Sequence, residues 1–374
     1  MISRSSNRSV SFLLAATIVI AAFPLLVQAA PAAPPATQKQ YQLVSTGSGS
    51  FALKLVEAPV RKPGLHEVLV RVRAASLNRR DIFIVHGQYP IGAKDGVVPL
   101  SDGVGEVAAV GPGVTRFRVG DRVAATFFQN WVSGRPNPNT PASALGGAID
   151  GVLSEYVTLN EQGLVAMPKH LSFEEASTLP CAGLTAWNGL VTTGHMQPGE
   201  YVLLEGTGGV SIAGLQFAVA AGAKPIITSS SDAKLERAKA LGAVGTVNYK
   251  TTPDWEKPVM ALTGGAGVQH ILEVGGKSTL PHALASMGPG AHIALIGGLG
   301  GFGGDIPALA ILGRGATVTG IFVGSRADFE AMNAFIEKHQ IHPVVDRVFD
   351  LKDAQAAYDL MESDNFFGKI VIKM

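Results

Sequence analysis

The sequence predicts an α/β protein in which a compact, barrel-like β domain precedes a doubly wound parallel sheet. Two observations carry this prediction. Short alternating apolar and polar runs, broken by glycine and proline, fill residues 40–168, and such a pattern is typical of small barrels. Beyond that point, apolar strand-like runs alternate with amphipathic helical runs, which is typical of a parallel sheet with helices on both faces.

The composition fits about two ordinary domains and indicates no partner by charge. The chain has 374 residues, of which 47% are hydrophobic and 16% are charged, with 30 basic and 29 acidic side chains. A formal net charge of +1 provides no field that would attract nucleic acid or anionic lipid. The single cysteine, Cys181, excludes an intramolecular disulfide and a four-cysteine zinc lobe.

The N-terminal segment has the order of a signal peptide. Arg4 and Arg8 precede an apolar run over residues 12–27, and small residues allow cleavage after Ala29, so the predicted signal is 1–29. The run is short for a membrane span, and no later segment is apolar enough to be one. We expect an exported protein, periplasmic or secreted. An uncleaved segment would instead anchor the same protein to a membrane.

The strand-like runs of the β domain are placed at 38–165. They are FALKLVEAP, EVLVRVRAASL, VGEVAAVGPGV, DRVAATFF and LSEYVTL. Strands this short and frequent, with turns such as GPG and VGD between them, favour a barrel. Two further strands, in PVVDRVFD and GKIVIKM, end the chain, and we expect the segment 325–374 to return to the β domain.

The parallel-sheet domain is placed at 166–324. It opens with a helix, because Ser172 and Glu175 have capping-box spacing. Helices are also expected at 210–221 and in DAKLERAKALG, which ends at Gly242. The expected strands are YVLLEG, PIITS, VGTVNY, VQHILEV, HIALIG and ATVTGIFVG.

The stretch EGTGGVSIAG, residues 205–214, is the candidate dinucleotide-binding loop because it directly follows a strand and directly precedes a helix. Glycines there permit a tight turn and let the backbone approach a pyrophosphate, and the helix N-terminus supplies free N–H groups. Ser211 stands where a third glycine is usual, and a small residue suffices there. The alternative is a purely structural glycine turn. The candidate coenzyme-binding residues are Gly206, Thr207, Gly208, Gly209 and Val210.

The end of the second strand of this sheet indicates which nucleotide binds. A ribose-binding Asp or Glu is expected about 20 residues after the loop, but the sequence has Ser229, Ser230 and Ser231 there, with Lys234 nearby. A carboxylate would repel a 2′-phosphate, whereas hydroxyls and an ammonium would bind it. This pattern favours NADP(H). The alternative is that the serines cap the next helix and that Lys234 is a solvated side chain.

Several separated motifs carry a family resemblance. They are AASLNRRD (74–81), PLSDGVGEVAAVGPGV (99–114), LPCAGLTAW (179–187), GTGGVS with TSSSDAKLERAKALGA, and FGKIVI (367–372). In this order they resemble the medium-chain dehydrogenase/reductase superfamily, and within it the zinc-free quinone oxidoreductases and enone reductases on its alcohol dehydrogenase-like side. The resemblance implies a GroES-like catalytic domain, a Rossmann NAD(P)-binding domain with the active cleft against it, and a homodimer.

The resemblance also implies further contacts with the coenzyme. Tyr249 would join Ser229 and Lys234 at the 2′-phosphate. Arg79 would touch the pyrophosphate, unless it forms a solvated basic pair with Arg80. The remaining assigned positions follow the later strands of the sheet or end the chain; they are Gly297, Phe322, Val323, Gly368 and Lys369.

Departures from the zinc alcohol dehydrogenases of the same superfamily predict a site without metal. Asn78 stands where those enzymes carry a ligating cysteine, and Leu100, Ser101 and Asp102 stand where they carry Gly-His-Glu. Only Cys181 matches a ligand of the catalytic zinc. A catalytic zinc needs about three protein ligands, which this set does not supply.

Without zinc, a substrate must bring its own electrophile, as quinones and α,β-unsaturated carbonyls do. Asn78 is the candidate hydrogen-bond donor to the negative oxygen that forms, and Thr185 would orient the nicotinamide. Asp81 would support the site or relay a proton. The alternatives are a polar turn residue for Asn78, a hydroxyl bonded to its own helix for Thr185, and an ion pair with an arginine for Asp81.

The sequence therefore predicts a zinc-independent, NADPH-dependent oxidoreductase that acts on a small quinone or carbonyl substrate. One alternative is a zinc-free alcohol or aldehyde dehydrogenase. The other is a protein that binds NADP(H) without turnover.

Overall fold

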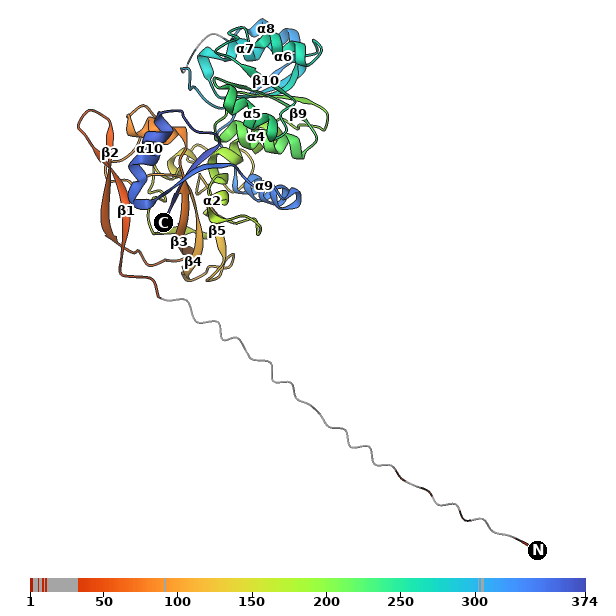
Figure 1. The fold of residues 1–374 in the computed structure, drawn as a ribbon. Coiled ribbons are helices and arrows are strands. Elements are labelled where there is room, and N and C mark those ends of the chain that lie inside the picture. The colour runs from red at the N-terminus through yellow and green to blue at the C-terminus, as the bar shows by residue number, and fades with distance from the viewer. Residues whose placement is uncertain are drawn as a thin grey trace. The chain divides into compact units, whose positions relative to one another are not determined.

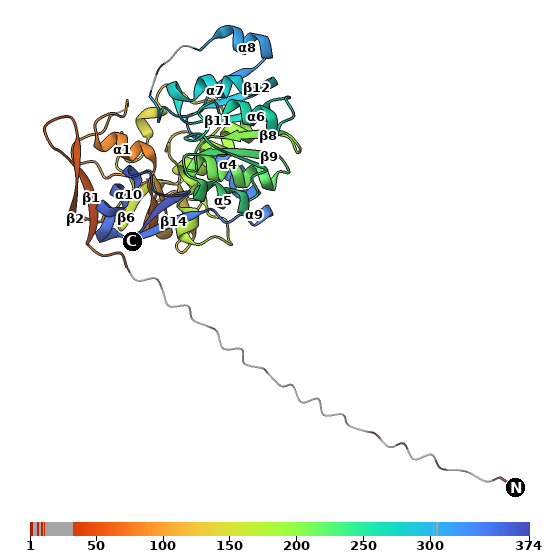
Figure 2. The same cartoon turned by 45° about the horizontal axis from the view of Figure 1, so that its top comes forward.

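Two sheets carry the fold, and both lie in the segment 33–374, which forms a single compact unit. The chain was analysed as a computed structural model (Figures 1 and 2). It describes residues 33–90, 92–301, 303 and 306–374, together with residues 1, 2, 6, 9 and 11. The predicted signal peptide therefore lies almost wholly outside the described residues. In the part that is described, no helix has the length and apolarity that a membrane crossing needs.

The first sheet has seven strands and is mostly antiparallel. Its order is β14-β15-β3-β4-β5-β7, and β6 pairs with β3 outside this path. β15 comes from the C-terminal end of the chain and lies antiparallel to β3, so the C-terminal segment returns to the sheet formed by the first half of the chain. β1 and β2 form a separate antiparallel hairpin. The strands are β1 (Thr37–Ser45), β2 (Phe51–Pro59), β3 (Glu67–Ser76), β4 (Asp102–Val110), β5 (Arg122–Ala125), β6 (Tyr156–Asn160), β7 (Leu164–Ala166), β14 (Val345–Asp350) and β15 (Lys369–Lys373).

Two helices close one side of this sheet. They are α1 (Arg79–Val85) and α10 (Ala354–Glu362), and their apolar residues Ile82, Tyr358 and Met361 share one buried cluster with strand residues of the sheet. α1 begins directly after β3, so the residues between the two elements are fixed at both ends.

The second sheet has six strands, all paired in parallel, in the order β10-β9-β8-β11-β12-β13. The strand order reverses between β8 and β11, and in open parallel sheets a ligand crevice lies at such a point, outside the carboxyl ends of the strands. The strands are β8 (Tyr201–Leu204), β9 (Lys224–Ser229), β10 (Gly245–Asn248), β11 (Val268–Glu273), β12 (Met287–Leu295) and β13 (Thr317–Gly320).

Helices cover both faces of the second sheet. Successive residues of a strand point to opposite faces, so neighbouring residues of β8 pack against different helices. Val202 and Leu204 of β8 share a buried cluster with residues of α4 and α5. Leu203, between them, belongs to a second cluster with residues of α6 and α7. The helices on or beside this sheet are α3 (Leu184–Trp187), α4 (Gly209–Ala220), α5 (Asp232–Ala240), α6 (Glu256–Leu262), α7 (Leu280–Ala285) and α8 (Ala308–Arg314). α2 (Phe173–Ala176) instead contacts β3 of the first sheet, and α9 (Arg326–His339) contacts β7 of the first sheet and α3.

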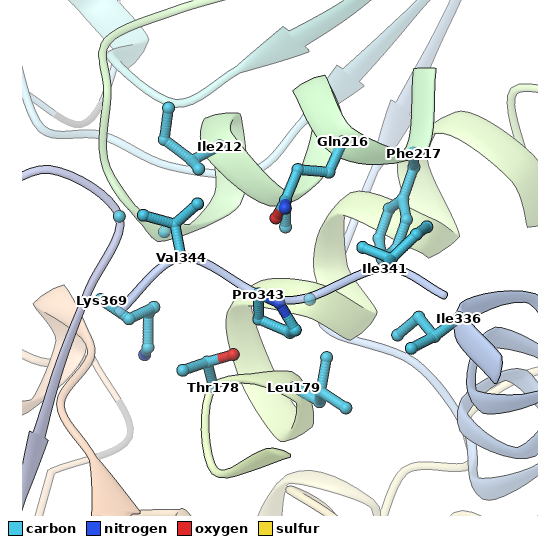
Figure 3. A pocket seen from close by; sticks show the side chains of 14 residues that line it. Thr178, Leu179, Ile212, Gln216, Phe217, Ile336, Ile341, Pro343, Val344 and Lys369 are labelled. Carbon is cyan, nitrogen blue, oxygen red and sulfur yellow. The ribbon is translucent and has the colours of Figure 1, made fainter. Parts of the chain in front are cut away.

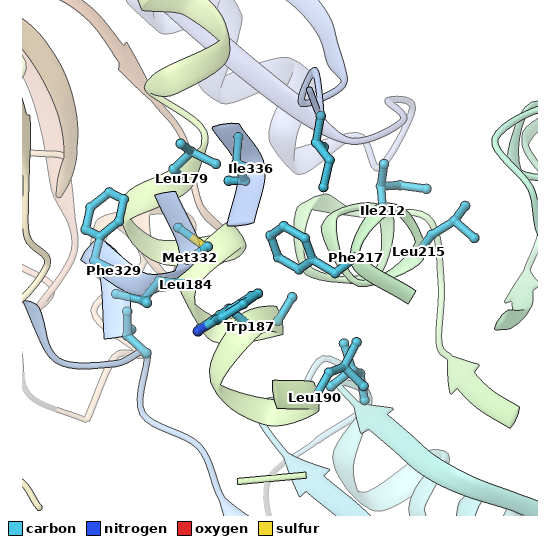
Figure 4. Close-up of a cluster of buried hydrophobic side chains, with 14 of the residues drawn as sticks. Leu179, Leu184, Trp187, Leu190, Ile212, Leu215, Phe217, Phe329, Met332 and Ile336 are labelled. Atoms are coloured by element: carbon cyan, nitrogen blue, oxygen red, sulfur yellow. The ribbon is translucent and has the colours of Figure 1, made fainter. Parts of the chain in front are cut away.

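The helical run around α3 connects the two sheets. It extends from Leu179 to Thr192, with a π-helical turn on either side of α3. The Trp187 ring lies 5.7 Å from the Phe217 ring of α4 at an edge-on angle. Figure 4 shows these rings beside Met332 and Phe329 of α9. This apolar cluster holds the run, and with it the segment that carries Cys181 and Thr185, against the helix that begins at the glycine-rich loop.

Candidate functional site

The loop after β8 has the geometry of a coenzyme cradle. Gly206 has a φ of +73°, which favours glycine, and a Cβ placed on Gly206 or Gly208 would meet nothing within 4 Å. Gly208 is the N-cap of α4, so free N–H groups of the first turn face this open space. The loop therefore fits a pyrophosphate, and Thr207 and Val210 lie within it.

Gly209 is closely packed against the C-terminal strand. A Cβ there would lie 2.5 Å from Lys369 Cδ and 3.0 Å from the Ala182 side chain. Glycine at this position therefore leaves room for the lysine stem. The C-terminal strand joins the same loop through its backbone, since Gly368 N–H donates to the Thr207 carbonyl at 2.9 Å.

A small pocket lies between these elements. Thr178, Gly209, Gly368 and Lys369 line one part of it, and Figure 3 shows Lys369 at one end and Ile336 at the other. Its lining comes from α4, the start of the α3 run, α9, the segment 341–344 and the start of β15.

Asn78 lies at the centre of a buried polar cluster between β3 and α1. It is 8% exposed, and its backbone N–H donates to Asp81 Oδ2 at 2.7 Å. Its side-chain Oδ1 accepts from Lys369 Nζ at 2.6 Å. The same ammonium lies 3.6 Å from Asp102 Oδ2, which also accepts from the backbone N–H of Cys181 at 3.2 Å. The structure thus brings together Asn78, Asp81 and Lys369.

Two charged residues of α1, Arg80 and Asp81, are buried beside Asn78. Burial raises the pKa of Asp81 to about 6. Arg80 Nη1 lies 3.8 Å from Asp81 Oδ1, and its guanidinium lies over the rings of Phe127 and Tyr89. The alternative of a solvated basic pair is wrong for Arg80, which is 7% exposed. No local pattern indicated this burial, because the ring of Phe127 comes from a distant part of the chain.

The residues assigned to the 2′-phosphate lie around the end of β9. Ser229 is buried, Ser230 is half-buried, and Tyr249 N–H donates to the Ser229 carbonyl at 3.1 Å. The neighbouring Ser231 is the N-cap of α5. Lys234 Nζ donates to the Asp364 carbonyl at 2.7 Å.

The same turn also binds Arg79, whose guanidinium pairs with the Asp364 carboxylate. Lys234 and Arg79, the two cations expected at the coenzyme phosphates, are therefore both held by one turn before β15. The structure thus brings these two cations together at Asp364.

The remaining assigned residues lie apart from this cluster. Thr185 is buried in α3. Gly297 follows β12, where a Cβ would lie 2.5 Å from the Val274 carbonyl oxygen. Val323 has a φ of +59° and its carbonyl accepts from Asn188 Nδ2 at 2.7 Å. The Phe322 ring meets that of Phe128 at 4.7 Å.

A buried pair of carboxyl groups at the switch point was missed by the sequence reasoning. Glu205 follows β8 and is 4% exposed, and Glu273 ends β11 and is fully buried. Glu205 Oε2 accepts from Val274 N–H at 3.3 Å, and Glu273 Oε1 accepts from Gly276 N–H at 2.8 Å. Burial and the neighbouring Glu273 raise the pKa of Glu205 well above its usual value. The signal available was an acidic residue in an otherwise apolar strand end.

The fold and this site define a class: an oxidoreductase built from a β domain and a nicotinamide-nucleotide domain, with its polar centre where the two meet. A family model described as "Alcohol dehydrogenase GroES-like domain" matches residues 64–169, and one described as "Zinc-binding dehydrogenase" matches residues 209–338. The chain belongs to the medium-chain dehydrogenase/reductase superfamily, in its zinc-type alcohol dehydrogenase-like group. The predicted superfamily and fold class are confirmed.

Relatives match nearly the whole chain. A zinc-type alcohol dehydrogenase-like protein of Schizosaccharomyces pombe is 48% identical over 87% of this chain and 96% of its own length. A crystal structure of a putative alcohol dehydrogenase from Sinorhizobium meliloti is 42% identical, with a TM-score of 0.86 over 91% of this chain and 100% of that one. A structure named as an NAD-dependent alcohol dehydrogenase is 34% identical, with a TM-score of 0.80 over 90% of this chain and 99% of that one.

The carboxyl pair predicts a pH-dependent stability. The pKa of Glu205 is raised in the folded state, so its carboxyl group stays protonated on folding where an exposed glutamate would be ionised. An exposed glutamate ionises at about pH 4.3. The free energy of unfolding therefore falls as the pH rises above this value. An uncharged Glu205→Gln side chain removes this dependence. We expect the difference in melting temperature, E205Q minus the unaltered protein, to increase from pH 5 to pH 8. The exposed Glu236→Gln change is the control, and an equal pH slope in E205Q and the unaltered protein would contradict the expectation.

Proposed function

We propose that the protein is a zinc-independent oxidoreductase that uses NADP(H) to reduce a quinone or an α,β-unsaturated carbonyl compound. The observation that carries the proposal is the Asn78 side chain, whose Nδ2 is buried without a hydrogen-bond partner beside a buried ammonium. An unpaired buried donor is costly, by about 1–3 kcal/mol, and such groups in native structures call for an explanation. A substrate oxygen would satisfy it.

The coenzyme part of the proposal is supported by the loop and by the end of β9. The space at Gly206 and Gly208 fits a pyrophosphate. Hydroxyls follow β9, and Lys234 lies close by. The nearest carboxylate along the chain, that of Asp232, accepts from Asn248 Nδ2 at 2.7 Å, so it already has a partner. These features favour a 2′-phosphate over a free ribose hydroxyl, although one structural relative is named for NAD.

The donor set at Asn78 does not fit zinc. No group of three or more His, Cys, Asp or Glu side chains suited to a metal occurs among the described residues. Burial raises the pKa of the Cys181 thiol, which disfavours the thiolate that zinc requires. The Lys369 ammonium already lies 2.6 Å from Asn78 Oδ1, and it would repel a second cation. These observations support a site without zinc despite the names of the relatives.

The side chains of the site would then act by hydrogen bonding. When bound, the nicotinamide coenzyme supplies a hydride. Asn78 Nδ2 would donate to the substrate oxygen that gains negative charge, and such donors are worth most when they are fixed and shielded from water. Thr185 and Val323 would hold the nicotinamide, and Asp81 would hold the backbone of Asn78 through its capping contact.

A second candidate function is alcohol or aldehyde oxidation, which the printed names of the relatives favour. The structure gives it less support, because an unactivated alcohol needs a Lewis acid or a base to ionise it. A third candidate is binding of NADP(H) without turnover, and an activity assay distinguishes it from the other two.

Turnover assays test the proposal directly. With purified protein, NADPH should be oxidised by at least one member of a quinone and enone panel, with a higher kcat/KM than NADH. Asn78→Asp replaces the Nδ2 donor by oxygen at nearly constant shape and should lower kcat by about 100-fold or more. Oxidation of simple alcohols with no quinone or enone reduction would favour the second candidate, and NADPH binding without any turnover would favour the third.

We also propose that the protein is a homodimer, formed through the free edge of the second sheet. β13 is an edge strand, and Leu309 and Leu312 of the adjacent α8 are 78% and 77% exposed. Exposed strand edges and apolar side chains are typical of interfaces. Sedimentation should give twice the chain mass, and Leu309→Asp with Leu312→Asp should give a monomer. Leu65→Asp, at another exposed leucine, is the control; a monomeric unaltered protein would refute the dimer.

Export is a further proposal, supported by the signal-like order of the N-terminal sequence alone. Two arginines precede the apolar run, and no acidic residue occurs before Glu57. N-terminal sequencing of the mature protein from its native host should begin at Ala30. A chain that begins at Met1 in the soluble fraction would contradict export.

A further inference from the structure

Lys369 connects the coenzyme loop to Asn78. Its backbone begins β15, directly after the residue whose N–H donates to the Thr207 carbonyl. The methylene stem then lies against the loop, since a Cβ on Gly209 would come within 2.5 Å of Lys369 Cδ and 3.2 Å of Cγ. One side chain therefore spans the distance from the loop that cradles the coenzyme to the residue proposed to bind the substrate oxygen.

The ammonium of Lys369 is buried and fully engaged. The residue is 4% exposed, and Nζ donates to the Leu77 carbonyl and to Asn78 Oδ1, the latter at 2.6 Å. Asp102 Oδ2, from a fully buried side chain, lies 3.6 Å away and supplies the opposite charge. A buried charge persists only when it is paired and hydrogen-bonded, and these three oxygens meet that requirement.

This arrangement sets the direction of the Asn78 amide. An ammonium can only donate, so the atom next to it must be the carbonyl oxygen of the amide, and the NH₂ group must point the other way. The amide Nδ2 is the buried atom that has no partner. With an apolar side chain at position 369, the amide would lose the ammonium that holds its oxygen, and it could turn over and present oxygen to the substrate.

We propose that Lys369 is a positioning residue for the reaction. It holds the Asn78 amide so that the Nδ2 donor faces the substrate oxygen. It also supplies a fixed positive charge at the position where zinc-dependent enzymes of the superfamily would hold their metal. Lys369 acts through Asn78 and does not itself touch the substrate. The inference rests on the proposed function, because it assumes that Asn78 binds the oxygen that becomes negative.

A double-mutant cycle with Lys369→Met and Asn78→Ala tests this role. Methionine keeps an unbranched stem against Gly209 and removes the charge. K369M should lower kcat at least tenfold, while the Kd for NADPH, measured by fluorescence titration, changes less than about threefold. Lys369→Arg, which keeps the charge, should recover most of the lost kcat. The double variant should be no slower than N78A alone, because a residue that acts only through Asn78 has no effect once Asn78 is gone.

Lys373→Met is the matched control. Lys373 lies on the same strand, is exposed, and pairs with Asp350 at 3.6 Å, so K373M should leave kcat and the NADPH Kd unchanged. If K369M does not fold, as judged by its melting curve, Lys369→Gln takes its place in the same cycle with the same expectation.

Three results would overturn the inference. Losses in kcat that add in the double variant would show that Lys369 acts independently of Asn78. A raised NADPH Kd with unchanged kcat would make Lys369 a coenzyme contact only. Absence of quinone or enone turnover in the unaltered protein would refute the proposed function itself, and this result is distinguishable because it precedes any substitution.

Discussion

The contact between the buried ammonium of Lys369 and the side chains of Asn78 and Asp102 is the interaction on which the account of this site depends. A positive charge placed between two sheets must find oxygen partners, and the partners available are an amide, a backbone carbonyl and a carboxylate. The same contact fixes the amide, connects β15 to the coenzyme loop and fills the centre with a cation. The proposal of a centre without zinc rests on the geometry and charge of this one contact.

Two devices place that contact accurately. The parallel sheet puts the glycine-rich loop at the switch point between β8 and β11, and the antiparallel pairing of β15 with β3 brings a C-terminal strand back to the start of α1. Neither sheet alone holds the site. Because the polar groups are rigidly packed from both sides, a single unpaired donor can persist at Asn78 until a ligand arrives.

Local patterns in the sequence predicted much of the fold. The capping box at Ser172 forms in both directions, and the helix expected at 210–221 is present as α4, Gly209–Ala220. The strands of the parallel sheet also follow the expected runs. These features depend on spacing within one element, which a sequence displays directly.

Contacts between segments that are distant along the chain could not be predicted from the sequence. The burial of Arg80 depends partly on the ring of Phe127, which follows β5. The close packing at Gly209 depends on Lys369, 160 positions later. The carboxyl pair of Glu205 and Glu273 depends on the strand order. The family resemblance named Asn78 and Lys369 separately. Their direct contact, which supports the proposal that one orients the other, is visible only in the packed structure.

The most direct test of the central claim is the zinc content of protein that is turning over. Elemental analysis on an extensively dialysed, active preparation should give far less than one zinc per chain, with NADPH oxidation undiminished after chelation. One zinc per chain, removed by chelator together with the activity and restored with it, would contradict a centre in which Lys369 provides the positive charge.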